Sequence, residues 1–343
     1  MDNPIVGSKV SRDPAMTDVA RLAGVSHQTV SRVLNGHPNV REQTRLRVRA
    51  AIEQLGYRPN NAARALVTGK SQLIGVIAQN SSLFGPASLL GAFESAAAEA
   101  GFSVSLRRVK VLDRDSIAAA VEHHRDARVA GIVAIAPTAS ANEALAEVPA
   151  GVPLVTVDGD PARESPLVTV DQFQGAFDAT TYLLESGHKT VWHVSGPPDW
   201  FDSAGRVQGW RAALAEARVE EPPLVAADWS AEAGYKAGQM LARMPECTAI
   251  FAANDHLALG ILRAMHERNR VVPRDVSVIG FDDVPEAAYF IPPLTTVRPD
   301  FDAVARETLG LLLAQVTEGE VGEIHRTVAP SLVVRSSVFV AGS

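Results

Sequence analysis

From residue 71 onward, short apolar runs rich in β-branched residues alternate with amphipathic stretches of helix length. The runs cover residues 73–78, 102–109, 131–136, 153–158, 191–196, 249–254, 276–282, 295–298 and 333–340. The helical stretches lie near residues 86–100, 114–127, 171–187, 203–217, 230–244, 255–269 and 300–317. Such alternation is typical of parallel sheets flanked by helices, so we expect an α/β body.

Several of the apolar runs end in polar residues. Asp158, Asn254 and Asp282 each stand at the end of a predicted strand. Ligands bind outside the carboxyl ends of the strands in open parallel sheets, so these side chains are candidates for a ligand site. Asn254 and Asp282 are also suited to cap the helix that follows, and both roles remain open.

Charge divides the chain into two parts. Residues 1–70 hold eleven Lys and Arg against five Asp and Glu, a net charge of +6, whereas the remaining residues hold 21 against 34, a net charge of −13. A small basic module beside a large acidic body suggests that the module binds a polyanion. The alternative is a basic helix face that is merely solvated.

Residues 17–35, TDVARLAGVSHQTVSRVLN, indicate two short helices joined by a tight turn. Thr17 is the predicted N-cap of the first helix, and Gly24 ends it in a left-handed conformation. Ser26 is the predicted cap of the second helix. A third helix after residue 40, running to about residue 55, completes a three-helix core.

The second helix carries side chains suited to contacts with DNA. If this helix lies in the major groove, Gln28 can bond two edge atoms of adenine, and Arg32 can do the same with guanine. Thr29 and Ser31 are candidates for phosphate contacts. The alternative is an ordinary helical hairpin with a polar face. Downstream, Pro59 favours a short linker helix over residues 61–67.

These motifs, in this order, resemble the lac repressor family of bacterial transcription regulators. The similarity covers nearly the whole chain and includes the following segments: residues 17–35, 55–60 (LGYRPN), 63–66 (ARAL), 228–230 (DWS), 253–260 (ANDHLALG), 276–283 (VSVIGFDD) and 291–298 (IPPLTTVR). The resemblance implies an all-α helix-turn-helix head and a two-lobed α/β body with parallel sheets, like the periplasmic binding proteins. It implies that the chain crosses between the lobes three times, near residues 160, 290 and 320.

The resemblance also implies which residues contact DNA. They are Thr17, Ser26, His27, Gln28, Thr29, Ser31, Arg32, Asn35, Asn60, Ala63 and Leu66. Leu66 matches the leucine that, in this family, wedges into the central minor-groove step and kinks the duplex. The alternative is that Leu66 packs on the body.

The implied effector site lies in the cleft between the lobes. Its residues are Leu83, Pro86, Asp158, Arg206, Trp229, Asn254, His256, Asp282 and Phe301. Polar side chains bond sugar hydroxyls there, and aromatic rings face the C–H surface of the sugar. Ala204 stands where lactose-responsive members have the arginine that grips the sugar, which argues against the same ligand. Trp200 and Phe201 in this loop either shape the pocket or pack the loop.

Catalytic motifs fail on spacing. Residues 68–71, TGKS, resemble the end of a phosphate-binding loop, but Arg64 stands where its first glycine is needed. Ser195 lacks the glycine of a nucleophile elbow. The histidine pairs 123/124 and 188/193 lack a carboxylate at metal-ligand spacing, and we expect these histidines at the surface. We therefore expect no enzyme, no cofactor and no bound metal.

The expected protein is a homodimeric repressor of carbohydrate-utilisation genes, which a small sugar releases from a pseudo-palindromic operator. A corepressor-dependent regulator, as among purine-sensing members, is the alternative; a sugar-binding protein without a DNA role is a further one. One cysteine, no signal peptide and no long apolar segment favour the cytoplasm and argue against a membrane partner. The expected domains are a flexible extension (1–15), the head (16–58), the linker (59–71) and the body (72–340).

Overall fold

The computed structural model describes residues 14–34, 37, 39–57, 71–148, 151–319 and 324–339. The chain divides into two compact units, and the boundary between them in the sequence falls between Ser71 and Gln72. Residues 1–13 of the predicted extension and the predicted linker helix of residues 61–67 lie outside the described residues. No helix within the described ranges is long and apolar enough to cross a bilayer.

The first unit folds as three helices around a small apolar core. They are α1 (Met16–Ala23), α2 (His27–Leu34) and α3 (Glu42–Leu55). Val19, Val30 and Val48 are fully buried between them. Gly24 ends α1 with φ 62°, a left-handed conformation that glycine adopts without strain, as predicted.

The helix caps confirm one sequence prediction and correct another. The Ser26 hydroxyl accepts the Thr29 N–H at 3.1 Å, so Ser26 caps α2 as expected. Thr17, however, is not the N-cap of α1, because the helix already begins at Met16. Asp18 takes the capping role: its carboxylate accepts the N–H of Ala15 at 2.9 Å and places negative charge in the first turn.

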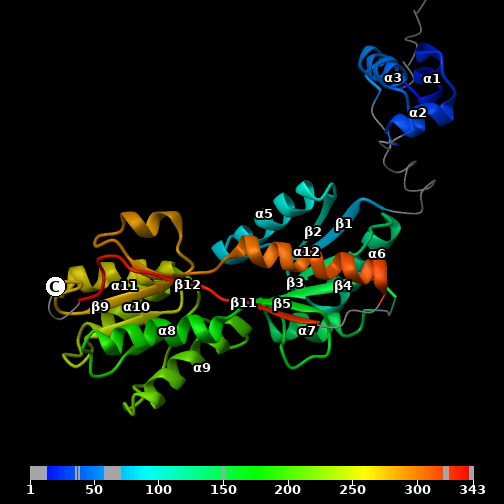
Figure 1. The fold of residues 1–343 in the computed structure, drawn as a ribbon. Helices are drawn as coiled ribbons and strands as arrows, with labels where there is room; N and C mark the ends of the chain where they lie inside the picture. Colours follow the sequence, from blue (N-terminus) through cyan, green and yellow to red (C-terminus); the bar gives the residue numbers. More distant parts are fainter. Residues whose placement is uncertain are drawn as a thin grey trace, which may run out of the picture. The chain divides into compact units, whose positions relative to one another are not determined.

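The second unit contains two lobes, each a six-stranded sheet with helices on both faces. Sheet order in lobe 1 is β11-β5-β4-β3-β1-β2, and every neighbouring pair is parallel, with Leu73 opposite Ser103 and Gly75 opposite Ile132. Its strands are β1 (Leu73–Gln79), β2 (Ser103–Val109), β3 (Ile132–Ile135), β4 (Leu154–Val157), β5 (Leu167–Val170) and β11 (His325–Val328). Helices α5 (Phe84–Glu99) and α12 (Phe301–Glu318) cover one face, and α6 (Arg114–Asp126) and α7 (Ala139–Leu145) cover the other (Figure 1).

Sheet order in lobe 2 is β12-β10-β9-β8-β6-β7, in which only β12 runs antiparallel to its neighbour. Its strands are β6 (Trp192–Ser195), β7 (Val225–Ala226), β8 (Ala249–Ala252), β9 (Ser277–Phe281), β10 (Thr295–Arg298) and β12 (Ser331–Val333). Helices α8 (Gln172–Glu185) and α9 (Phe201–Glu216) pack on one face, and α10 (Ala231–Leu241) and α11 (Asp255–Glu267) on the other; a short 3-10 helix, η1 (Pro285–Tyr289), follows β9. The predicted two-lobed parallel fold is confirmed.

The chain crosses between the lobes three times, as predicted, but further along the sequence. The crossings fall at Asp171 (β5 to α8), at residues 299–300 (β10 to α12) and at residues 329–330 (β11 to β12). The sequence pattern did not reveal β5 and β11, which keep the chain in lobe 1 past residues 160 and 320. Each has only four residues, too few for a long apolar run.

The expected strand over residues 333–340 is also wrong, because β12 ends at Val333. Beyond it, single backbone bonds and side-chain bonds take the place of a regular ladder. The Ser337 carbonyl accepts the Val278 N–H at 2.9 Å, while the Ser337 hydroxyl donates to the Val278 carbonyl at 2.6 Å and accepts the Thr295 N–H at 2.8 Å. The C-terminal segment therefore stays on the sheet through both backbone and side-chain bonds.

Candidate functional site

A cleft in the body is lined from both lobes at the carboxyl ends of the strands. Eight of the nine predicted effector residues line it: Leu83, Pro86, Asp158, Arg206, Trp229, Asn254, Asp282 and Phe301. The ninth, His256, is exposed in the first turn of α11 and does not line the cleft, because the helical period turns it away from Asn254.

Seven further residues line the cleft: Phe84, Gly85, Val170, Gln172, Trp200, Asp202 and Pro299. For Trp200 the sequence left pocket and loop packing as equal alternatives, and its ring lies in the pocket wall. Asp202 lies two residues further along the same loop and helix start, so it was within reach of the sequence argument. Gln172 was not, because it follows β5, a strand that the sequence pattern did not reveal.

Arg206 forms the polar centre of the lobe 2 wall. It is almost fully buried; its Nε donates to Gln172 Oε1 at 2.8 Å, and its Nη1 donates to the Ala253 carbonyl. Its Nη2 lies 3.7 Å from an oxygen of Asp282, and the guanidinium stacks 3.7 Å from the centre of the Phe281 ring. These contacts fix the guanidinium in one orientation.

Three carboxyl groups line the cleft beside this single guanidinium, on Asp158, Asp202 and Asp282. Burial raises the pKa of Asp282 to about 7, against the opposing effect of Arg206, and the charge of Asp202 adds to the rise. Burial and the charge of Asp202 raise the pKa of Asp158 well above its usual range. Burial also raises the pKa of Asp202, while Arg206 opposes it. Burial therefore favours the neutral form of all three carboxyl groups.

Trp229 forms the aromatic wall of the cleft and depends on a glycine. A Cβ on Gly196 would lie only 2.3 Å from the Trp229 ring, so no larger residue fits there. Trp200 meets Trp229 edge to face, with ring centres 5.5 Å apart. The Trp229 Nε1–H is buried and has no acceptor among the residues that the structure describes.

Asn254 holds the strand end and the next helix together. Its side-chain oxygen accepts the Leu257 N–H at 2.8 Å, and its amide nitrogen donates to the Trp229 carbonyl at 3.1 Å. The capping role considered for Asn254 is thus present, and the same residue lines the cleft. The capping role considered for Asp282 is not seen, because the next helix, η1, begins only at Pro285. Asp282 follows directly after β9 and has φ 108°, a strained conformation.

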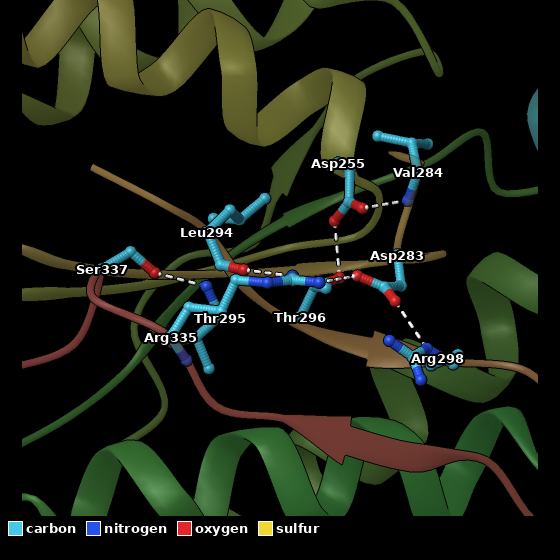
Figure 2. A network of polar contacts seen from close by, with 9 residues as sticks. All are labelled: Asp255, Asp283, Val284, Leu294, Thr295, Thr296, Arg298, Arg335 and Ser337. Carbon is cyan, nitrogen blue, oxygen red and sulfur yellow. Dashed lines mark hydrogen bonds and ion pairs between the residues drawn. The ribbon is translucent and has the colours of Figure 1, made fainter. Parts of the chain in front are cut away.

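A network of polar contacts includes Asp255 and Asp283, the residues that follow the cleft residues Asn254 and Asp282 in the chain (Figure 2). The Asp255 carboxylate is fully buried; it accepts the Val284 N–H at 2.8 Å and the Thr296 hydroxyl at 2.6 Å. Burial raises the pKa of Asp255 well above its usual range, and the charge of Asp282 adds to the rise. The network holds the loop after β9 against β10.

Asp283 ties this loop to the segments that run between the lobes (Figure 2). One oxygen accepts from Arg298 at 2.5 Å, and the other accepts from Arg335 at 2.6 Å. Arg298 is the last residue of β10, immediately before the second crossing, and Arg335 follows β12, just after the third. Arg335 also donates to the Leu294 carbonyl at 2.7 Å. Asp283 thus connects the cleft residue Asp282 to two crossings.

Two histidines that we expected at the surface are buried instead. His193 stacks on Phe251 with ring centres 4.6 Å apart, and burial lowers its pKa to about 4. His124 occupies the space left by Gly75, where a Cβ would lie 2.7 Å from the ring. No group of three metal-ligating side chains occurs within the described part of the chain.

On the first unit, α2 presents the predicted base-reading residues to solvent. His27, Gln28 and Arg32 are exposed, whereas Val30 on the opposite side is fully buried. The other predicted DNA contacts in this unit are placed as follows: Thr17 and Ser26 are exposed, and Thr29 and Ser31 are half-buried. Asn35, Asn60, Ala63 and Leu66 lie outside the described residues.

A helix-turn-helix unit joined to a two-lobed body with a cleft at its strand ends defines a ligand-responsive DNA-binding regulator. Residues 15–60 match the bacterial regulatory proteins of the lacI family, and residues 180–338 match the periplasmic binding protein-like domain. The chain belongs to the lacI family of bacterial regulatory proteins.

Three relatives illustrate the match. The lactose operon repressor of Escherichia coli (strain K12) is 32% identical over 94% of this chain and 90% of its own length. The transcriptional regulator CelR of Thermobifida fusca is 34% identical over 95% and 98%. The transcriptional repressor PurR of Proteus mirabilis (strain HI4320) is 33% identical over 94% and 96%.

Solved structures agree with this assignment. A lac repressor dimer bound to operator and the anti-inducer ONPF has a TM-score of 0.85 at 30% identity, covering 96% of this chain and all of that one. A complex of CelR with cellobiose has a TM-score of 0.70 at 30% identity, covering 94% and 99%. The expected family and fold are confirmed.

Proposed function

We propose that this chain is a sequence-specific DNA-binding repressor of carbohydrate-utilisation genes that a small neutral sugar releases from a pseudo-palindromic operator. One observation carries the sugar assignment: the cleft places the Trp229 ring among hydrogen-bonding side chains of both lobes, Asp158 in lobe 1 and Arg206, Asn254 and Asp282 in lobe 2. An aromatic face for C–H groups beside polar groups for hydroxyls is the chemistry that recognises a pyranose.

The names of the relatives support this class of effector. One regulator is named for the lactose operon, and the CelR structure holds cellobiose. Relatives that are transcriptional regulators support a role without catalysis, and a DNA regulator works in the bacterial cytoplasm.

On the DNA side we assign base reading to His27, Gln28 and Arg32, because α2 exposes them while it buries Val30. We assign further DNA contacts around the recognition helix to Thr17, Ser26, Thr29, Ser31 and Asn35. We assign DNA contacts through the linker to Asn60, Ala63 and Leu66. This assignment follows the family match over residues 15–60.

The response to ligand follows from how the chain is connected. Along the chain, the body begins in lobe 1, where β1 starts at Leu73. A ligand held between the lobes changes the angle of lobe 1 relative to lobe 2, and hence the spacing of two heads in a dimer. By linkage, operator weakens ligand binding by the same factor by which ligand weakens operator binding.

A homodimer supplies the second head. Tyr289 and Ile291, in one segment of lobe 2, are 85% and 94% exposed, which is unusual for large apolar side chains at a free surface. A second copy of the chain is the occupant we assign to this segment, since lac repressor forms a dimer in the operator complex.

Selection of random duplex DNA by the full chain at physiological salt, with and without a pool of mono- and disaccharides, tests the proposal. We expect a palindrome that is enriched without sugar and lost with it. Enrichment only in the presence of the pool would show a corepressor instead. No enriched sequence in either condition would contradict the DNA-binding function, and conversion of a pool sugar to product would contradict the role without catalysis.

A further inference from the structure

A segment of lobe 2, residues 197–202, bridges the two lobes at the cleft, and we call it the strap. The Phe201 N–H donates to the Pro137 carbonyl at 2.9 Å, and the Ala139 N–H donates to the Asp199 carbonyl at 3.2 Å. Thr138 and Trp200 form an isolated antiparallel bridge between them. Residues 137–139 follow β3 of lobe 1, so the strap connects the lobes at a place separate from the three crossings.

The strap also carries two side chains of the cleft wall. Trp200 and Asp202 both line the cleft, next to Trp229 and Arg206. Trp229 is 9% exposed, whereas Trp200 is half-buried, so the two rings lie at different depths. Trp229 is thus the inner aromatic wall, and Trp200 is the outer one.

The geometry of the two rings separates their roles. Their planes lie 72° apart, with ring centres at 5.5 Å. A pyranose is a flat object on the scale of an indole, so one sugar ring can lie against one of these faces but not against both. Two aromatic surfaces at different depths therefore suit two linked sugar rings.

Charge at the outer wall restricts the ligand further. The guanidinium of Arg206 already bonds Gln172 and Ala253 and lies near Asp282, so no free cation remains among the described residues that line the cleft. Asp202, which lines the same cleft, offers oxygen atoms that can bond sugar hydroxyls. Phosphorylated and carboxylated sugars are disfavoured here, and neutral ones are accepted.

We propose that Trp200 forms an outer sugar subsite beside the Trp229 subsite, so that the effector is a neutral disaccharide or longer oligosaccharide. This inference rests on the proposed function and names its ligand class. Because the strap backbone is bonded to lobe 1, a sugar in the outer subsite touches the element that connects the lobes. Occupancy of this subsite therefore bears directly on the lobe angle.

Calorimetric titration of the full chain with matched sugars tests the proposal. The probes are glucose with cellobiose and maltose, and galactose with lactose and melibiose. We expect at least one disaccharide to bind about tenfold or more tightly than its monosaccharide. Trp200→Ala should weaken that disaccharide about tenfold and change the monosaccharide less than about twofold, and Trp200→Phe should restore most of the difference.

Phe201→Leu is the matched control, because Phe201 belongs to the strap but its side chain does not line the cleft. It should leave the ratio of disaccharide to monosaccharide affinity unchanged. Equal binding of both sugar classes by the wild type, or equal weakening of both by Trp200→Ala, would overturn the outer subsite while leaving a sugar-responsive repressor intact. Failure of every sugar, both to bind and to release operator, would contradict the proposed function itself.

Discussion

Gly196 is the residue on which the aromatic wall of the cleft depends. We expect Gly196→Ala to displace the Trp229 ring, because the added Cβ would meet it at 2.3 Å. Overpacking of this kind costs about 1–3 kcal/mol of unfolding free energy. Displacement of a ring from a sugar site should weaken sugar binding about tenfold or more. Thermal unfolding and calorimetric titration with the effector measure the two effects.

Gly91→Ala is the matched control for that change. Gly91 lies in α5 with nothing within 4 Å of its Cβ position, and its backbone is helical. Alanine favours helix over glycine by up to about 1 kcal/mol, so the control should be neutral or slightly stabilising. An effect of Gly196→Ala no larger than that of the control would contradict the dependence of Trp229 on this glycine.

Asp282 should make the stability of the body depend on pH near neutrality. Burial raises its pKa to about 7, whereas an unfolded chain has an aspartate pKa of about 3.9. Between these values the folded chain keeps a proton that the unfolded chain has released, so the free energy of unfolding rises as pH falls. We expect the melting temperature to rise from pH 8 to 6.5.

In the Asp282→Asn variant, the rise in melting temperature from pH 8 to 6.5 should be smaller. Asp158 and Asp202, whose pKa values are also raised, account for the rise that remains. The comparison stops at pH 6.5 because the buried histidines, whose pKa values are lowered, oppose the trend below it. Asp275→Asn is the control: its pKa is about 2, so its profile in this window should match the wild type. A wild-type melting temperature that falls toward pH 6.5 would refute the assignment.

At the scale of elements, Arg335 holds the segment after β12 to the loop after β9. Its bonds to Asp283 and to the Leu294 carbonyl are short, and its side chain is largely buried. We expect Arg335→Ala to lower the free energy of unfolding by about 2 kcal/mol, since it leaves a buried carboxylate short of a partner. Hydrogen exchange should become faster in residues 331–337.

Arg274→Ala provides the comparison, because Arg274 pairs with Asp275 at an exposed site. Such surface pairs contribute about 0–1 kcal/mol, so the variant should unfold almost as the wild type does. Similar losses in both variants would show that the Asp283 contacts do not hold the crossings.

Substitutions in helix α2 can distinguish side chains that contact DNA bases from side chains that contact the DNA phosphates. Arg32→Ala should cost about 1–3 kcal/mol of operator binding and relax the preference at one base position. Thr29→Ala should weaken binding to all sequences alike and leave its salt dependence unchanged, because the lost hydroxyl carries no charge. Binding selections with each variant measure both effects, and an Arg32→Ala protein with unchanged sequence preference would exclude α2 as the reading helix.

The elements also show how far the sequence determined the fold. Long amphipathic helices and buried strands such as β1 and β9 were predictable because local periodicity and tertiary burial agree there. The strands β5, β7 and β11 were not, because their few residues carry too short a pattern, and tertiary pairing alone defines them. The first and third crossings were misplaced for the same reason.

The cleft was predictable where its residues end recognisable strands or match family motifs, as for Asp158, Asn254 and Trp229. Asp202 was within reach of the same argument, since it lies in the strap that carries Trp200. Gln172 was not, because it follows β5 and its place in the cleft depends on the packing of α8 against α9. Gly209 illustrates why this packing could not be predicted from one sequence. A Cβ at residue 209 would lie 2.1 Å from the Phe173 carbonyl oxygen, so α9 can pack this closely on α8 only because residue 209 is glycine.

At the scale of the whole molecule, the dimer contact that we propose at Tyr289 and Ile291 would determine whether two heads act together. We expect Ile291→Glu to yield monomers in sedimentation, because a charge at the centre of an apolar contact must be desolvated without a partner. Operator affinity should fall by several orders of magnitude, since each half-site then binds one head alone. Effector binding should persist, because Ile291 does not line the cleft.

Val111→Glu is the control: it changes an exposed valine in lobe 1 and should leave the dimer intact. A dimeric Ile291→Glu protein with normal operator affinity would place the interface elsewhere on the body.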